Sequence, residues 1–444
     1  MGVVVLPTVV SLSRTLARLA IGLDKRPELV AHLTRRESMM GNDEAGERVT
    51  LVESSANVIR EGFKKCLSER SGPASGTTPD GKPEGRRVGI YVMSNLCLKL
   101  FFHCRKIRNA EQIFGNIYQQ SPPLALYPAS QRVTYLYYLG RYLFSNNHFY
   151  RAQLALQAAY DQCHARCLKQ RRLILIYLVT ANIILGRFPS PSLLQRPEAE
   201  GLAEKFLPVC HTITKGDLTS FRRLLDLDSE NADWFVTKRI LFQLRNRCEV
   251  LVWRSLARRT FVLSGFHGDT SNKAPLLNLA DLLALATFLE KRASLPSDHL
   301  SNGSKHIDGR LHTNSIFIVP PEPPPQDPAS YTDPDLLGAV TPTGPPLPTM
   351  MEIESVVSSL VDQGLLRGYI SHKFLRFAIV GAKARGALPA GFPNVWETLS
   401  ASADKEVPGW VTEGKAAAGG LGMKVGPGMV VNLSGARPAG AAPL

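Results

Sequence analysis

The sequence predicts a mainly α-helical protein, in which a TPR-like, right-handed helical stack is followed by a C-terminal winged helix with a small antiparallel sheet. Three observations predict this fold class. Between positions 89 and 293, apolar residues recur every three or four positions, as in helices that bury one face. Short turns join these helices into consecutive hairpins, and stacked hairpins form a superhelix. After position 350, an amphipathic helix precedes two short runs of β-branched and aromatic residues.

The first 67 residues are expected to form two or three helices. In the most apolar of them, five residues at helical spacing predict one buried face. They are Val9, Leu12, Leu16, Leu19 and Leu23. The next stretch, 68–88, is rich in Gly, Pro and Ser and lacks an apolar pattern, which predicts a flexible linker.

The stack is most clearly predicted by one hairpin. QRVTYLYYLGRYLF (131–144) and HFYRAQLALQAAYDQC (148–163) are two helical patterns separated by Ser145-Asn146-Asn147, a turn signal. Gly140 lets the two helices approach closely. The segment RRLILIYLVTANIILGRFP (171–189) is apolar on nearly all sides, as in a helix buried among others. A last long helix is expected over 232–263.

The end of the ordered chain predicts the second half of a winged helix. Five apolar residues share one helical face, and Gly364 caps that helix. They are Ile353, Val356, Val357, Leu360 and Val361. LLRGYISH (365–372) and LRFAIV (375–380) then have the length and composition of two wing strands. The predicted organisation is N-terminal helices 1–67, linker 68–88, helical stack 89–293, disordered proline-rich insertion 294–349, winged helix 350–396 and disordered Gly/Ala-rich tail 397–444.

Positive charge is concentrated in the predicted stack. The formal net charge is +14, and residues 89–266 carry 24 Lys and Arg against 11 Asp and Glu. A basic excess on a folded region favours a polyanionic or acidic partner. The alternative is a solvated surface that keeps the protein soluble.

Composition also predicts the compartment. Seven cysteines without regular spacing argue against a disulfide framework and for a reducing environment. In the apolar N-terminus, Arg14 and Arg18 interrupt or follow the apolar core instead of preceding it, unlike a secretory signal. No uninterrupted apolar stretch reaches the roughly 18 residues that span a bilayer. We therefore expect a soluble intracellular protein without a membrane partner.

Motifs for catalysis are weak. The string from Gly76 to Lys82 matches a phosphate loop, but Pro83 replaces the required Ser or Thr. Cys163, His164 and Cys167 have no second ligand pair, which structural zinc usually needs. Neither a nucleophile elbow nor an H-E-x-x-H helix is present. We expect no enzyme activity, no metal, no cofactor and no small-molecule substrate.

Two basic clusters are the candidate binding sites. The first lies on or near the proposed wing, where Lys and Arg contact a phosphate backbone and release counterions. It consists of Arg367, Lys373, Arg376, Lys383 and Arg385. The second lies on the long helix and favours a partner surface. It consists of Arg245, Arg247, Arg254, Arg258 and Arg259. A solvated face, or pairing of the second cluster with Glu249, is the alternative.

Three blocks of the sequence resemble a known family. They are RVTYLYYLGR within 131–141, KQRRLILIYL over 169–178 and GYISH over 368–372. In order and spacing they are similar to PCI-domain proteins, in the branch of signalosome subunit-twelve-like proteins and the PCI subunit of the transcription-and-export complex. The likeness runs from about 89 to 382, broken by the proline-rich insertion. That insertion and the Gly/Ala-rich tail depart from the family.

The resemblance implies a scaffold subunit of a nuclear complex that couples transcription to messenger RNA export. It implies a larger winged-helix partner beside the wing, for which Tyr369 and Ile370 are candidate contacts, and a small acidic tether protein on the helices. The joint surface would bind DNA or RNA. The expected location is the nucleus, with the cytoplasm as a second site. The alternative is a protein-only scaffold of a signalosome-like or proteasome-lid-like complex.

Overall fold

The structure, a computed structural model, describes residues 2–29, 50–68, 77–78, 82–268, 274–293 and 348–411. It is mainly helical with one small C-terminal antiparallel sheet, which confirms the predicted fold class. The chain divides into two compact units, residues 1–132 with 406–444 and residues 133–405. Most of the predicted insertion, 294–347, and the tail from 412 lie outside the described residues, as does most of the string from Gly76 to Lys82.

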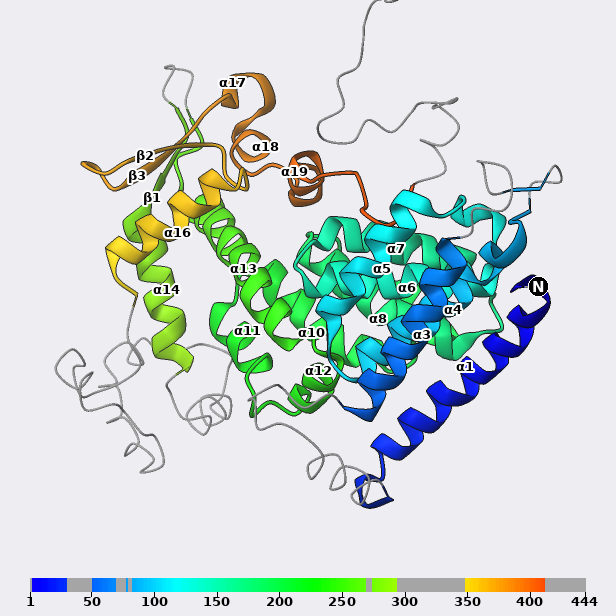
Figure 1. Ribbon diagram of the computed structural model, residues 1–444. Helices are drawn as coiled ribbons and strands as arrows, with labels where there is room; N and C mark the ends of the chain where they lie inside the picture. Colours follow the sequence, from blue (N-terminus) through cyan, green and yellow to red (C-terminus); the bar gives the residue numbers. More distant parts are fainter. Residues whose placement is uncertain are drawn as a thin grey trace, which may run out of the picture. The chain divides into compact units, whose positions relative to one another are not determined.

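Within its described residues, the first unit is built on four α-helices. These are α1 (Gly2–Asp24), α3 (Leu51–Leu67), α4 (Ile90–His103) and α5 (Ala110–Gln120), with 3-10 turns at Pro27–Leu29, Gly85–Gly89, Ile107–Asn109 and Leu124–Leu126. Helix α3 begins at its N-cap Thr50, whose side chain accepts a hydrogen bond from the Glu53 amide. It packs along α4, and α1 lies against both (Figure 1). The turn at Gly85–Gly89 falls within the segment for which a flexible linker was expected.

The buried face of α1 is only in part the one that spacing predicted, because Leu16 and Leu23 are half-buried and the other three predicted residues are exposed. Leu12 and Leu19 are 65% and 58% exposed, and Val9 is also exposed. The buried side chains are instead Ser13, Ala17 and Ala20 (with Val10 half-buried), because small residues let α1 lie close to its neighbours. By length and composition alone, Val4–Asp24 is the one described helix that could cross a membrane. Core helices of soluble proteins and signal sequences can have the same length and apolar composition.

The second unit begins with the predicted hairpin. Helix α6 (Ala129–Ser145) starts just before the unit boundary, and α7 (Phe149–Gln162) and α8 (Leu168–Ile184) follow. A Cβ atom added at Gly140 would lie 2.5 Å from Leu156 Cγ, so the expected close approach of α6 and α7 is confirmed. Helix α8 is buried on all sides from Ile174 to Ala181, as its composition predicted.

The expected long helix over 232–263 is broken in two. After α9 (Pro191–Leu194), Pro197–Ala199, α10 (Leu202–Lys215) and α11 (Leu218–Leu224), the chain forms α12 (Ala232–Lys238) and α13 (Leu241–Ser264). Between them Arg239 adopts the left-handed conformation, with φ of 57°. Its amide donates to Val236 O, and the Ile240 amide donates to Phe235 O, which closes α12. Sequence missed this break because neither Gly nor Pro marks it.

The winged helix contains the two predicted strands and a third. Its elements are β1 (Leu276–Asn278), α14 (Leu279–Ala293), α16 (Met350–Asp362), β2 (Gly368–Ser371), β3 (Arg376–Ile379), α17 (Ala382–Arg385) and α18 (Ala387–Gly391). The antiparallel sheet has the order β1-β3-β2 (Figure 1). Helix α16 starts with a capping box of Thr349 and Glu352, and Gly364 follows its end with φ of 70°. Residues 276–293, expected in the stack, thus lie beside β3 and α16.

A final helix, α19 (Val395–Ser402), lies in a region for which a disordered tail was expected from 397 onward. It packs on the stack. A Cβ atom added at Gly186, just after α8, would lie 2.5 Å from Val395 Cγ1, and the Trp396 ring lies 5.8 Å from that of Tyr150 on α7. The winged helix is therefore connected back to the helical hairpins within this unit.

Candidate nucleic-acid and partner interface

The small sheet has a buried inner face and an exposed outer face. Along β3, Phe377 and Ile379 point to the side opposite Arg376, because side chains alternate along a strand. Phe377 and Ile379 are buried and Arg376 is exposed. Tyr369 of β2 lies opposite Ala378, which puts it on the same face as Arg376. The outer face therefore presents an aromatic and a cationic side chain.

All five basic residues predicted for nucleic-acid binding are exposed. We call them the basic wing. Arg367 precedes β2, Lys373 lies in the turn between the strands, Arg376 lies on β3, and Lys383 and Arg385 lie on α17. All five therefore lie at exposed positions of the winged helix, from the residue before β2 to the end of α17. Their role in binding stays a prediction.

Two exposed aromatic rings accompany these cations. Tyr369 is 59% exposed and Phe374, at the tip of the turn, is 63% exposed. The Lys373 ammonium lies 5.6 Å from the centre of the Phe374 ring. Sequence reasoning missed Phe374, although an apolar ring between two strands of a short wing is a usable signal. Ile370, the other predicted partner contact, lies opposite Phe377 and is only half-buried, so it faces the inner side.

Strand β2 is an edge strand. Within the described residues it pairs with β3 alone, so its second row of backbone groups has no strand partner. Such an edge can accept a strand from another chain.

The five arginines that were predicted to form one cluster on α13 have different surroundings in the structure. Arg245 pairs with Asp226 at 3.4 Å, and Arg247 lies 6.0 Å from the centre of the Phe149 ring. Glu249, the expected intrachain partner of the cluster, is instead paired with Arg222 of α11 at 2.5 Å. Arg245 and Arg247, the first two arginines of the cluster, therefore both have contacts within the chain.

The side chain of Arg254 extends from α13 to the winged helix. Its Nη2 donates to Pro393 O at 2.5 Å and its Nε donates to Leu365 O at 3.3 Å. Burial, and then the neighbouring Arg258, lower the pKa of Arg254 to about 10. Arg254 thus uses two of its five N–H donors to hold two segments of the winged helix against the stack.

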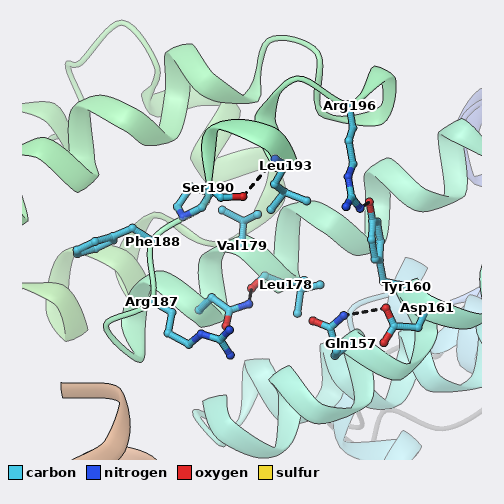
Figure 2. Close-up of a pocket in the computed structure, with 12 residues that line it drawn as sticks. Gln157, Tyr160, Asp161, Leu178, Val179, Arg187, Phe188, Ser190, Leu193 and Arg196 are labelled. Carbon is cyan, nitrogen blue, oxygen red and sulfur yellow. Dashed lines mark hydrogen bonds between the residues drawn. The ribbon is translucent and has the colours of Figure 1, made fainter. Parts of the chain in front are cut away.

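Two cavities lie in the second unit, and the second of them is lined by arginines of α13. The first, about 340 Å³, is lined by α7, α8 and the segment that follows α8. Figure 2 shows Arg187 and Phe188 on one side of this cavity and Tyr160 and Arg196 on the other. The second, about 460 Å³, is lined by α10, α13 and the start of α19, and it contains Arg254, Arg258 and Arg259.

Comparison with known proteins agrees with this architecture. The chain is 28% identical to a PCI domain-containing protein of Schizosaccharomyces pombe over 73% of its own length and 58% of that protein. It is 31% identical to the protein CSN12 homolog of Neurospora crassa, over 58% of this chain and 56% of the relative. The PCI domain-containing protein 2 homolog of Drosophila melanogaster is 24% identical over 62% of this chain and 65% of its own length. The chain is a PCI domain-containing protein. No family model matches it.

This PCI-domain protein spans less than two thirds of the length of each of these relatives. The resemblance noted from sequence is confirmed at the level of the family, with relatives named after CSN12 and after PCI domain-containing protein 2.

A buried ionic network in the PCI-domain protein was not predicted. Glu198 is 5% exposed and accepts hydrogen bonds from the Tyr160 hydroxyl at 2.6 Å and from Arg171 Nε at 2.9 Å. Burial raises the pKa of the Glu198 carboxyl, but these two bonds, a backbone hydrogen bond and the charge of Arg171 together outweigh it, so the pKa is lowered. Arg196 donates to Tyr160 from the first cavity. The three partners are up to 38 positions apart, so spacing carried no signal.

The weak metal motif lies in the turn between α7 and α8. Cys163 is buried, Cys167 is exposed, and burial raises the pKa of the Cys163 thiol. Among the described residues no group of three or more His, Cys, Asp or Glu side chains is arranged to hold a metal ion. All seven cysteines are free thiols.

Proposed function

We propose that this PCI-domain protein is a non-enzymatic scaffold subunit of a nuclear complex that couples transcription to messenger RNA export. In this role its winged helix binds nucleic acid, DNA or RNA, together with a larger winged-helix partner. The observation that supports it best is the basic wing, five exposed cations interleaved with the exposed rings of Tyr369 and Phe374. Cations supply phosphate contacts, and aromatic rings supply stacking surfaces.

The larger partner would sit at the free edge of β2. Tyr369 lies on that strand and gives the partner an aromatic contact, of the kind enriched where interfaces are most buried. The small acidic tether protein that the family resemblance implies would be attracted by the net charge of +14.

Binding to nucleic acid is tested by reversing three charges of the basic wing. Lys373→Glu, Arg376→Glu and Lys383→Glu together should weaken binding at least 10-fold and to a similar degree for all base sequences, since phosphate contacts carry no sequence information. The matched control reverses three exposed cations of the same unit that are outside the wing, Arg166→Glu, Lys169→Glu and Arg223→Glu. Equal affinity of the triple variant and the wild type would exclude the wing as the contact surface.

A second candidate is a protein-only scaffold of a signalosome-like or proteasome-lid-like complex. The open edge of β2 favours it, because strand addition there needs no nucleic acid. Co-purification with the full chain separates the two. Export factors among the recovered subunits support the first proposal, and lid or signalosome subunits without export factors support the second.

A further inference from the structure

The two cavities of the second unit are adjacent. Phe188, in the segment after α8, lines both of them and is 39% exposed. We call the pair the arginine groove. Its cationic lining residues are Arg187 and Arg196 on one side of Phe188 and Arg254, Arg258 and Arg259 on the other. Every cation that lines the groove is a guanidinium, and none is a lysine.

The groove has almost no negative charge of its own. Asp161 is the one carboxylate among the described residues that line it, and Gln157 donates to it at 2.9 Å. Arg258 and Arg259 are exposed and form no ion pair within the described part of the chain. Planar guanidinium groups match the geometry of phosphate oxygens.

The arrangement on α13 costs stability unless an anion binds. Arg254 and Arg258 are four positions apart on one helix, and like charges at this spacing repel each other. Burial lowers the pKa of Arg254, and the repulsion by Arg258 lowers it further. A bound phosphate beside Arg258 would offset this repulsion.

The first cavity contains a hydrogen-bond acceptor in addition to its arginines. Asn182 lines it, and the Asn182 Nδ2 group donates to Leu178 O at 2.9 Å. The Asn182 Oδ1 atom is buried and has no hydrogen-bond partner among the described residues. It is an unused acceptor at the cavity wall, suited to the amine or imino hydrogen of a base. The exposed ring of Phe188, between this acceptor and the α13 arginines, has a face on which a base can stack.

We propose that the arginine groove binds single-stranded nucleic acid, with phosphates on Arg258 and Arg259 and a base against Phe188. An unpaired nucleotide carries an anion, a flat ring and hydrogen-bond donors together. A duplex keeps its bases stacked and offers the groove phosphates alone. The inference rests on the proposed function and deepens it, because it names the form of nucleic acid and a second contact surface besides the basic wing.

The test uses the full chain and labelled 20-nucleotide single strands of RNA and DNA, with the corresponding duplex as a second probe. Arg258→Glu with Arg259→Glu should lower single-strand affinity at least 10-fold and duplex affinity less than 3-fold. Phe188→Ala, which changes no charge, should lower single-strand affinity about 5-fold or more, the range for loss of one base–aromatic stack. Lys169→Glu with Arg223→Glu is the charge-matched control, and circular dichroism and thermal unfolding confirm that each variant is folded.

Three outcomes overturn the inference. Unchanged single-strand binding in both the arginine variant and Phe188→Ala removes the groove as a nucleic-acid site. Equal losses for single strand and duplex remove the preference for unpaired bases. Loss of binding to a polyglutamate probe, with single-strand binding intact, assigns the groove to an acidic protein.

The failure of this inference is distinguishable from failure of the proposed function. If the triple reversal of the basic wing abolishes binding while the groove variants bind normally, the wing proposal stands and the groove inference fails. If the groove variants lose single-strand binding while the triple variant binds normally, the inference stands and the wing is not the contact surface.

Discussion

At the scale of single residues, two contacts are the clearest tests of how the hairpins pack. Gly140 and Leu156 meet where α6 crosses α7, and Glu198 joins α7 and α8 to the turn at Pro197–Ala199 through Tyr160 and Arg171. The first contact was predictable, because a lone glycine in an apolar helix indicates close approach. The second was not, because its members come from separate elements and each alone resembles an ordinary surface residue.

Gly140→Ala is expected to lower the free energy of unfolding by about 1–3 kcal/mol. The added methyl group would overlap Leu156, which outweighs the roughly 1 kcal/mol that alanine contributes to a helix. The matched control is Gly115→Ala on α5, where an added Cβ meets nothing within 4 Å and the variant should be more stable than wild type. Denaturant unfolding measures both. A stabilised Gly140→Ala protein would contradict the packing of α6 on α7.

Glu198→Gln is expected to lower the free energy of unfolding at pH 7 by about 1.5–3 kcal/mol, the value of hydrogen bonds to a charged group. Because folding lowers the pKa of Glu198, its stabilisation is present above the unfolded pKa of about 4.3 and is lost as pH falls through the folded pKa. The difference between wild type and variant should therefore shrink below about pH 4. Unfolding curves at pH 7, 5 and 3 measure it, and a difference independent of pH would show that Glu198 is not ionised in this network.

At the scale of elements, local patterns were predictable and long-range pairing was not. The strands β2 and β3 followed from two adjacent runs of β-branched and aromatic residues. Strand β1 has three residues and pairs with β3 about a hundred positions later, so nothing nearby in sequence marked it. In α1 the apolar residues surround the helix, and spacing alone could not select the face with Ala17 and Ala20.

The break between α12 and α13 allows a test whose sign distinguishes two structures. Arg239 has φ of 57°, a conformation that costs a residue with a side chain roughly 1–2 kcal/mol and costs glycine nothing. Arg239→Gly should therefore raise the free energy of unfolding by about 1 kcal/mol, whereas Arg239→Ala should not. In a continuous helix over 232–263, glycine would instead destabilise by about 1 kcal/mol. Thermal unfolding of the two variants decides between a break and a continuous helix.

At the scale of the whole molecule, composition predicted a basic surface but not its distribution. Arg245 pairs within the chain and Arg254 holds the winged helix, while Arg258 and Arg259 line a cavity. The five cations of the wing, by contrast, are all exposed, as expected for residues that contact a partner. A helix pattern tells which arginines share a face, and only the packing of neighbouring elements determines which of them are available.

The central claim is that the exposed surface of the winged helix, and not a catalytic pocket, carries the function. The most direct test is the salt dependence of duplex binding by the wild type and by the variant with Lys373→Glu, Arg376→Glu and Lys383→Glu. Each lost phosphate contact lowers the slope of log affinity against log salt concentration by about 0.9. The account predicts a slope smaller by roughly 2–3 in the variant, with weaker binding at low salt. An identical slope and affinity in the two proteins would contradict it.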